Sequence, residues 1–214
     1  MTKEAKVITL IAVVFLIGFG LLIWKAPGVK TAGPIDQSIL VRENSHMIGL
    51  QTASASVVEF GDYQCPACGL AHPILKEVVD QYKDNPNFNF VFRNFPLPQH
   101  SNALIAAEAA EAAGAQGKFW EMHDALYENQ AEWSDSKDPL SIFVTYAETI
   151  GLDDLEKFKT DVTAHAFADA VRSDMTDANS LFVNHTPTVY LNGEEIDSFN
   201  VQTLKASIDA ALAK

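Results

Sequence analysis

The sequence contains very little cysteine. Only two of its 214 residues are cysteines, Cys65 and Cys68. Two thiols cannot build the network of crosslinks that stabilises small disulfide-rich domains. A chain of this length must therefore depend on an ordinary hydrophobic core, and its 48% hydrophobic content is enough to form one.

Basic residues are also scarce, with 15 Lys and Arg against 28 Asp and Glu and a net charge of −13. Nucleic acids and anionic membrane surfaces attract an excess of Lys and Arg, so neither is expected as a partner. The sequence has no G-x-G-x-x-G nucleotide motif and no H-E-x-x-H zinc motif. We therefore expect no metal, flavin or nucleotide cofactor.

Near the N-terminus, Val7–Trp24 is a run of 18 uncharged residues, with Lys3 and Lys6 before it and Lys25 after it. As a helix it would span roughly 27 Å, close to the thickness of a bilayer core. A cleaved signal peptide is the alternative, but its apolar region is usually shorter and is followed by a cleavage site. We expect residues 1–25 to form a single transmembrane anchor, with the rest of the chain outside the cytoplasm.

The next segment, residues 26–52, is rich in proline and glycine and is predicted to be a tether. Within it, IDQSILVREN fits a strand or a short helix equally well. The folded domain is predicted to occupy residues 53–214. It would start with a buried strand, ASASVVEF, followed by a helix from Cys65 and an alternating strand over residues 87–96.

Between about residues 101 and 183 the sequence becomes rich in alanine and predicts a block of helices. The strand pattern returns over residues 186–199, where Asn192–Gly193 predicts a hairpin turn. A last helix, capped by Asn200, closes the chain. The order β–α–β, helices, β–β–α predicts an α/β fold with a helical insertion.

The two cysteines form a C-P-A-C motif between the first strand and its helix. A zinc site would need two more ligands, and no second C-x-x-C exists, so a redox pair is favoured. Cys65 would lie at the helix N-terminus, where unpaired N–H groups stabilise a thiolate. Cys68, one turn further along the same face, would be the buried resolving thiol.

The stretch EFGDYQCPACGLAHP resembles the active-site segment of DsbA-like thiol–disulfide oxidoreductases of the thioredoxin-fold superfamily. Glu59, six residues before Cys65, matches a buried acid of that family, and Pro73 matches the proline that kinks the helix. HTPTVYLNG resembles the family's cis-proline strand. The resemblance covers residues 53–214 and implies a thioredoxin-like fold in which the helical block is the insertion typical of the DsbA type.

The resemblance also assigns roles to particular residues. Cys65 and Cys68 would form the redox-active disulfide, with Pro66 and Ala67 between them facing the substrate. Glu59 would accept a proton from Cys68. Pro187 would follow a cis bond, and the backbone of Thr186 would pair with an extended substrate.

The resemblance implies a dithiol oxidase that acts on thiol-containing or disulfide-containing proteins, as a monomer. It would be reoxidised by a quinone-linked membrane protein of the DsbB-like or VKOR-like kind. Strongly oxidising members carry a histidine where this chain has Ala67, so we expect a less extreme oxidant. A reductase or isomerase fed by a membrane electron donor is the alternative, and a non-catalytic binding module is a third.

Three aromatic residues of the insertion, Phe119, Trp120 and Tyr127, are expected in the core. The active-site helix is predicted to bury a face that includes Leu70 and Val78, with His72 on the helix surface.

Overall fold

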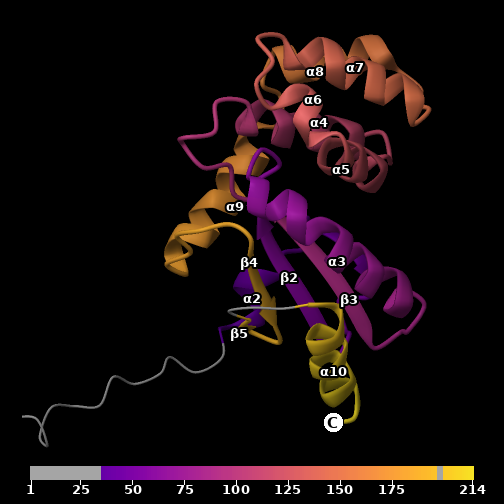
Figure 1. The fold of residues 1–214 in the computed structure, drawn as a ribbon, viewed down its shortest axis with the longest axis vertical. Helices are drawn as coiled ribbons and strands as arrows, with labels where there is room; N and C mark the ends of the chain where they lie inside the picture. The colour runs from indigo at the N-terminus through magenta and orange to yellow at the C-terminus, as the bar shows by residue number, and fades with distance from the viewer. Residues whose placement is uncertain (1–34, 197–199) are drawn as a thin grey trace, which may run out of the picture. The chain divides into compact units, whose positions relative to one another are not determined.

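The computed structural model describes residues 35–196 and 200–214 (Figure 1). The predicted anchor, residues 1–25, lies outside this range, together with residues 26–34 of the predicted tether. No helix within the described residues combines the length and the apolar character that a membrane crossing requires.

The centre of the domain is a mixed sheet with the strand order β1-β3-β2-β4-β5. The two central strands, β2 (Ala55–Gly61) and β3 (Phe88–Asn94), are parallel and buried along their whole length. This confirms both predicted strands, and the second, expected to alternate, is buried at every position. The outer strands all run antiparallel to their neighbours, and they are β1 (His46–Gly49), β4 (Thr188–Leu191) and β5 (Glu194–Glu195).

The domain begins earlier than the sequence predicted. Residues 35–52, expected to belong to the tether, contain helix α2 (Gln37–Leu40) and strand β1. β1 pairs with β3, and Leu40 is fully buried. Both elements have only four residues, too few for a periodic pattern to show, so their structure is decided by the partners they pack against.

Helices cover both faces of the sheet (Figure 1). Along β2, Val57 packs on the side of α3 (Pro66–Tyr82) and α10 (Val201–Leu212), whereas Val58 packs on the side of α2 and α9. This alternation is the period of two that any strand imposes. Because both faces are covered, the central strands contain almost no exposed polar positions.

The predicted helical insertion is present between β3 and β4. In Figure 1 most of its helices gather above the end of the sheet where α3 begins. The predicted helices and the break near Thr163 are confirmed, and the short α6 was not predicted. The insertion contains α4 (Ala103–Gly114), α5 (Phe119–Glu128), α6 (Gln130–Trp133), α7 (Pro139–Thr149), α8 (Leu155–Thr163) and α9 (Ala168–Ser180).

A buried guanidinium group joins the insertion to the sheet. Arg93 on β3 is fully buried and forms ion pairs of 2.6 Å with both Asp174 and Asp177 of α9. Its Nη1 also donates to the carbonyl oxygens of Ile39 and Leu40, at 2.9 and 3.0 Å. One side chain therefore connects the sheet, the end of the insertion and α2.

We predict that Arg93→Ala lowers the free energy of unfolding by about 3–5 kcal/mol, because it leaves two carboxylates without their buried partner. Urea denaturation monitored by circular dichroism would measure this. Arg172→Ala is the control, since Arg172 pairs with Asp169 in an exposed i,i+3 contact and its loss should change stability by less than about 1 kcal/mol. Equal effects of the two substitutions would contradict the prediction.

Candidate active site

Cys65 lies at the N-cap of α3, as predicted. Its backbone N–H donates to the carbonyl of Asp62 at 3.0 Å, and its carbonyl accepts the first helical hydrogen bond from Gly69 at 3.1 Å. Pro66 occupies the first helical turn, where its missing N–H is not needed. The Cys65 side chain therefore sits beside the unpaired N–H groups of the helix terminus.

Both cysteines are free thiols in this structure. Cys68 is completely buried, while Pro66 and Ala67 are exposed between the pair. The pKa of Cys65 is lowered to about 5, and the largest cause is a hydrogen bond from the Cys68 thiol. Backbone N–H groups of Ala67 and Cys68 lower this pKa further, whereas burial raises it. Burial raises the pKa of Cys68. This difference in pKa is the one that a nucleophilic Cys65 and a resolving Cys68 require, and those roles stay a prediction.

The predicted proline loop faces the cysteine pair. The Thr186–Pro187 peptide bond is cis, and the carbonyl oxygen of Thr186 lies 3.4 Å from the Cys65 sulfur. Residues 186 and 187 immediately precede β4, which pairs with β2. The structure therefore brings Thr186 and Pro187 to Cys65 across 121 residues of sequence, while their role in binding substrate stays a prediction.

Glu59 on β2 is buried, with 2% of its surface exposed. Its Oε1 has no hydrogen-bond partner among the described residues. Burial, followed by the nearby Cys65 charge, raises the pKa of Glu59 to about 8. The burial expected from its apolar strand is confirmed. A carboxyl with such a pKa can exchange protons near neutrality, so the predicted role is chemically available.

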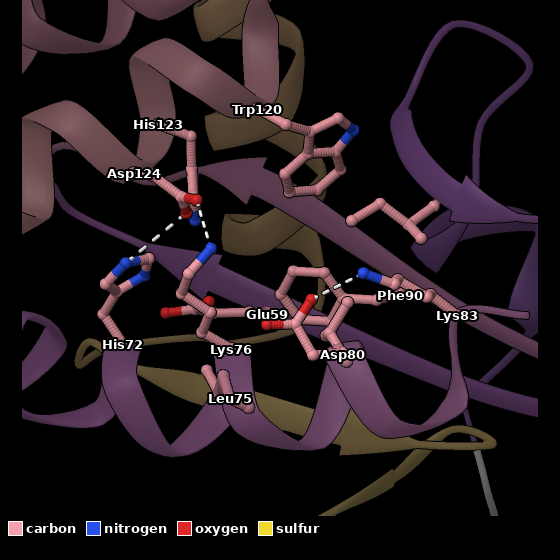
Figure 2. Close-up of a pocket in the computed structure, with 12 residues that line it drawn as sticks. Glu59, His72, Leu75, Lys76, Asp80, Lys83, Phe90, Trp120, His123 and Asp124 are labelled. Atoms are coloured by element: carbon pink, nitrogen blue, oxygen red, sulfur yellow. Dashed lines mark hydrogen bonds and ion pairs between the residues drawn. The ribbon is translucent and has the colours of Figure 1, made fainter.

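Glu59 lines a cavity of about 200 Å³ next to α3 (Figure 2). Six other polar side chains also line this cavity: His72, Lys76, Asp80, Lys83, His123 and Asp124. The buried Glu59 carboxyl therefore borders a cavity with several charged or titratable side chains in its wall.

His72 was predicted to lie on the surface of α3, but it is buried. It lies four residues after Cys68, on the same helix face, and burial lowers its pKa. Leu70, expected in the core, is instead 76% exposed. The apolar pattern of α3 therefore predicts the wrong buried face, because the helical insertion covers the side of the helix that carries His72.

Among the three aromatic residues predicted in the core, Phe119 and Tyr127 are buried, and Trp120 is half-buried beside the cavity.

Two polar residues that the motif did not single out hold the active-site loop. The Asp62 carboxylate is fully buried and accepts hydrogen bonds from the N–H groups of Gln64 and Leu97, both at 2.8 Å, and lies 2.6 Å from His100 Nδ1. Gln130 at the start of α6 donates to the carbonyl oxygens of Tyr63 and Cys65, at 2.7 and 2.9 Å. The sequence pattern assigned no role to either residue, and Gln130 lies 65 residues from Cys65 in the sequence.

Comparison with known proteins supports this interpretation of the fold. A family model described as thioredoxin matches residues 42–210. The structure of a thioredoxin-like oxidoreductase from Silicibacter pomeroyi DSS-3 is similar with a TM-score of 0.69 at 27% identity, over 84% of this chain and 99% of that one. Wolbachia pipientis α-DsbA1 shares the fold with a TM-score of 0.72 at 19% identity, over 83% of this chain and 95% of that one.

A curated relative carries a different name. The Na⁺/H⁺ antiporter NhaA 1 of Salinispora arenicola is 37% identical over 173 residues. The matched region is 80% of this chain, yet the chain spans only about a quarter of the length of that relative. The similarity therefore concerns one part of a much longer protein.

The sheet, the insertion and the cysteine pair at the start of α3 together define a thioredoxin-like fold of the DsbA type. The chain belongs to the thioredoxin family.

We predict that the reduced protein shows a thiolate transition, followed by ultraviolet absorbance, with a midpoint near pH 5. Cys68→Ala should move the midpoint upward, because it removes the largest hydrogen bond to the Cys65 thiolate. Cys65→Ala should abolish the low-pH transition and serves as the control. A wild-type midpoint near pH 9 would contradict the assignment of Cys65.

We also predict that Glu59→Gln stabilises the oxidised protein increasingly as the pH rises from 4.5 towards 8. The pKa of Glu59 is raised in the folded state, so the unfolded chain loses its proton first and the wild type loses stability across this window. The difference should reach a few kcal/mol in urea denaturation at matched pH values. The exposed Glu148→Gln is the control, and a pH-independent difference at Glu59 would refute the prediction.

Proposed function

We propose that this chain is a thiol–disulfide oxidoreductase that oxidises pairs of thiols in protein substrates. The observation that carries the proposal is the asymmetry of the cysteine pair. The pKa of Cys65 is lowered to about 5, while Cys68 is buried behind it with a raised pKa. A thiolate stabilised in the reduced protein makes the oxidised protein a better oxidant.

The reaction would start with Cys65 and Cys68 joined as a disulfide. A substrate thiolate attacks the Cys65 sulfur, the bond between the two cysteines breaks, and Cys68 leaves as a thiolate. Glu59 in its neutral form supplies the proton that Cys68 takes up. A second substrate thiolate then attacks the substrate sulfur of the mixed disulfide and displaces Cys65, so the substrate loses two electrons and the cysteine pair gains them.

The low pKa of Cys65 suits the last of these steps, because thiols of low pKa leave faster. Thr186 would hold the substrate during the exchange, and the 3.4 Å distance between its carbonyl oxygen and the Cys65 sulfur supports this role. Extended peptides commonly bind by adding backbone hydrogen bonds to such a segment. Exposed Pro66, Ala67 and Leu70 would border the bound substrate.

The reduced protein must then be reoxidised. We propose a quinone-linked membrane protein, DsbB-like or VKOR-like, as the electron acceptor, with Cys68 attacking the second mixed disulfide while Glu59 accepts its proton. An anchor in residues 1–25 would place the domain, as a monomer, on the extracytoplasmic side of the membrane and raise its effective concentration near this partner.

Ala67 supports a second candidate, a reductase or isomerase, because it supplies no charge to stabilise the Cys65 thiolate further. Ion transport is not proposed, since that name belongs to relatives of which this chain matches only a quarter. The two redox directions differ in the potential of the cysteine pair.

The test is the reduction potential of the full chain, measured by equilibration with glutathione. A value of about −120 to −180 mV is expected for an oxidant or isomerase, whereas a value near about −270 mV would match thioredoxin and overturn the oxidase proposal. Oxidative refolding of a reduced protein substrate should be lost in Cys65→Ser. Cys68→Ser should instead trap a mixed disulfide at Cys65, and unchanged refolding by both variants would indicate a binding module.

A further inference from the structure

His72, His123 and Asp124 form a cluster on the wall of the cavity beside α3 (Figure 2). Each offers one ligand atom, and the three atoms lie within 4.8 Å of one another. His72 comes from α3, while the other two are consecutive residues of α5. The cluster is therefore held between two helices rather than on loops.

The spacing of this cluster suits a shared ion better than direct contact. His72 Nε2 lies 3.5 Å from Asp124 Oδ1, which is long for a hydrogen bond. Two ligands that bind one tetrahedral zinc ion, each at about 2.0–2.1 Å, are themselves separated by about 3.4 Å. The two atoms thus already have the separation that a common ion would require.

The ring nitrogen of His72 is also left without a partner. His72 is 7% exposed, and its Nε2 is buried with no hydrogen-bond partner among the residues that the structure describes. Buried polar atoms are normally paired, so an orphan of this kind calls for an explanation. An ion bound between His72 and Asp124 would supply the missing partner.

His123 has the supporting contact that a metal ligand usually has. Its Nδ1 lies 3.0 Å from the hydroxyl of Tyr63, which is itself buried. If Nδ1 donates to that hydroxyl, Nε2 carries the lone pair that binds a metal, and the ring is held in one orientation. The His72 ring is held in turn by stacking on Tyr127, at 5.0 Å between ring centroids.

Lys76 is the group that opposes a cation here, because its ammonium pairs with Asp124 Oδ2. Its side chain is 41% exposed, so it can turn into solvent without leaving a buried charge. Asp124 has a second oxygen, the one that lies near His72. Lys76 should therefore weaken binding of a cation without blocking it.

We propose that His72, His123 and Asp124 bind one divalent transition-metal ion, with zinc as the favoured class. Two imidazoles and one carboxylate are a common ligand set for zinc, and the remaining position would be taken by water in the cavity. The site uses neither cysteine as a ligand but shares its cavity with Glu59, and the proposal does not depend on the direction of the redox reaction.

Titration of the oxidised, metal-free full chain with Zn²⁺ would test this, with calorimetry as the readout and Co²⁺ absorption spectra as the second. The disulfide form is used because reduced thiols bind zinc themselves. One equivalent should bind, giving a tetrahedral Co²⁺ spectrum and a higher melting temperature in the presence of Zn²⁺.

His72→Gln and Asp124→Asn should each abolish this binding, while Tyr63→Phe should weaken it about 10-fold or more. Lys76→Gln should strengthen Zn²⁺ binding. A variant that failed to fold would bind less zinc, so a gain in affinity cannot come from misfolding. His165→Gln is the matched control, because His165 is an exposed histidine that follows the C-terminus of α8 and does not line the cavity. No binding by the wild type or by Lys76→Gln, or equal binding by His72→Gln, would overturn the proposal.

Discussion

The parallel pairing of β2 with β3 is the constraint on which the active site depends. Parallel strands end at the same edge of a sheet, so the loops that follow them meet there. Gly61 lies opposite Asn94 in the register, and the Phe95 N–H donates to the Gly61 carbonyl at 2.8 Å. The loop after β3 can then supply the donors that satisfy Asp62, just before Cys65. Without this pairing the cysteine motif would have no fixed surroundings.

The electrostatics of the cysteine pair come from hydrogen bonds rather than from neighbouring cations. The chain has a net charge of −13, and an excess of negative charge by itself disfavours a thiolate. The nearby Asp62 carboxylate, however, is turned away into contacts with backbone N–H groups and His100. The helix terminus and the Cys68 thiol are then free to act on Cys65. An acidic protein can therefore still hold a reactive thiolate.

Local signals in the sequence predicted the local features of the fold. Asn192 and Gly193 both adopt positive φ values in the hairpin turn, and Asn200 forms a reciprocal capping box with Thr203. These features depend on a few consecutive residues. The cysteine pair at the start of α3 and the order of elements were predicted for the same reason.

Features that depend on distant partners could not be predicted in this way. The burial of Arg93 makes sense only once Asp174, 81 residues later, lies beside it. β1 forms only because β3 offers an edge, and His72 is buried only because α5 covers it. Family resemblance supplied the position of Pro187, since sequence pattern alone does not indicate a cis bond.

The turn at Gly193 determines where the domain is joined to the chain before it. Gly193 has a φ of +84°, and a side chain there would collide with the backbone of Ile35. The Ile35 N–H donates to the Gly193 carbonyl at 2.9 Å. This corner lies at the end of β4 opposite to Thr186, so the entry point and Cys65 occupy opposite ends of the sheet.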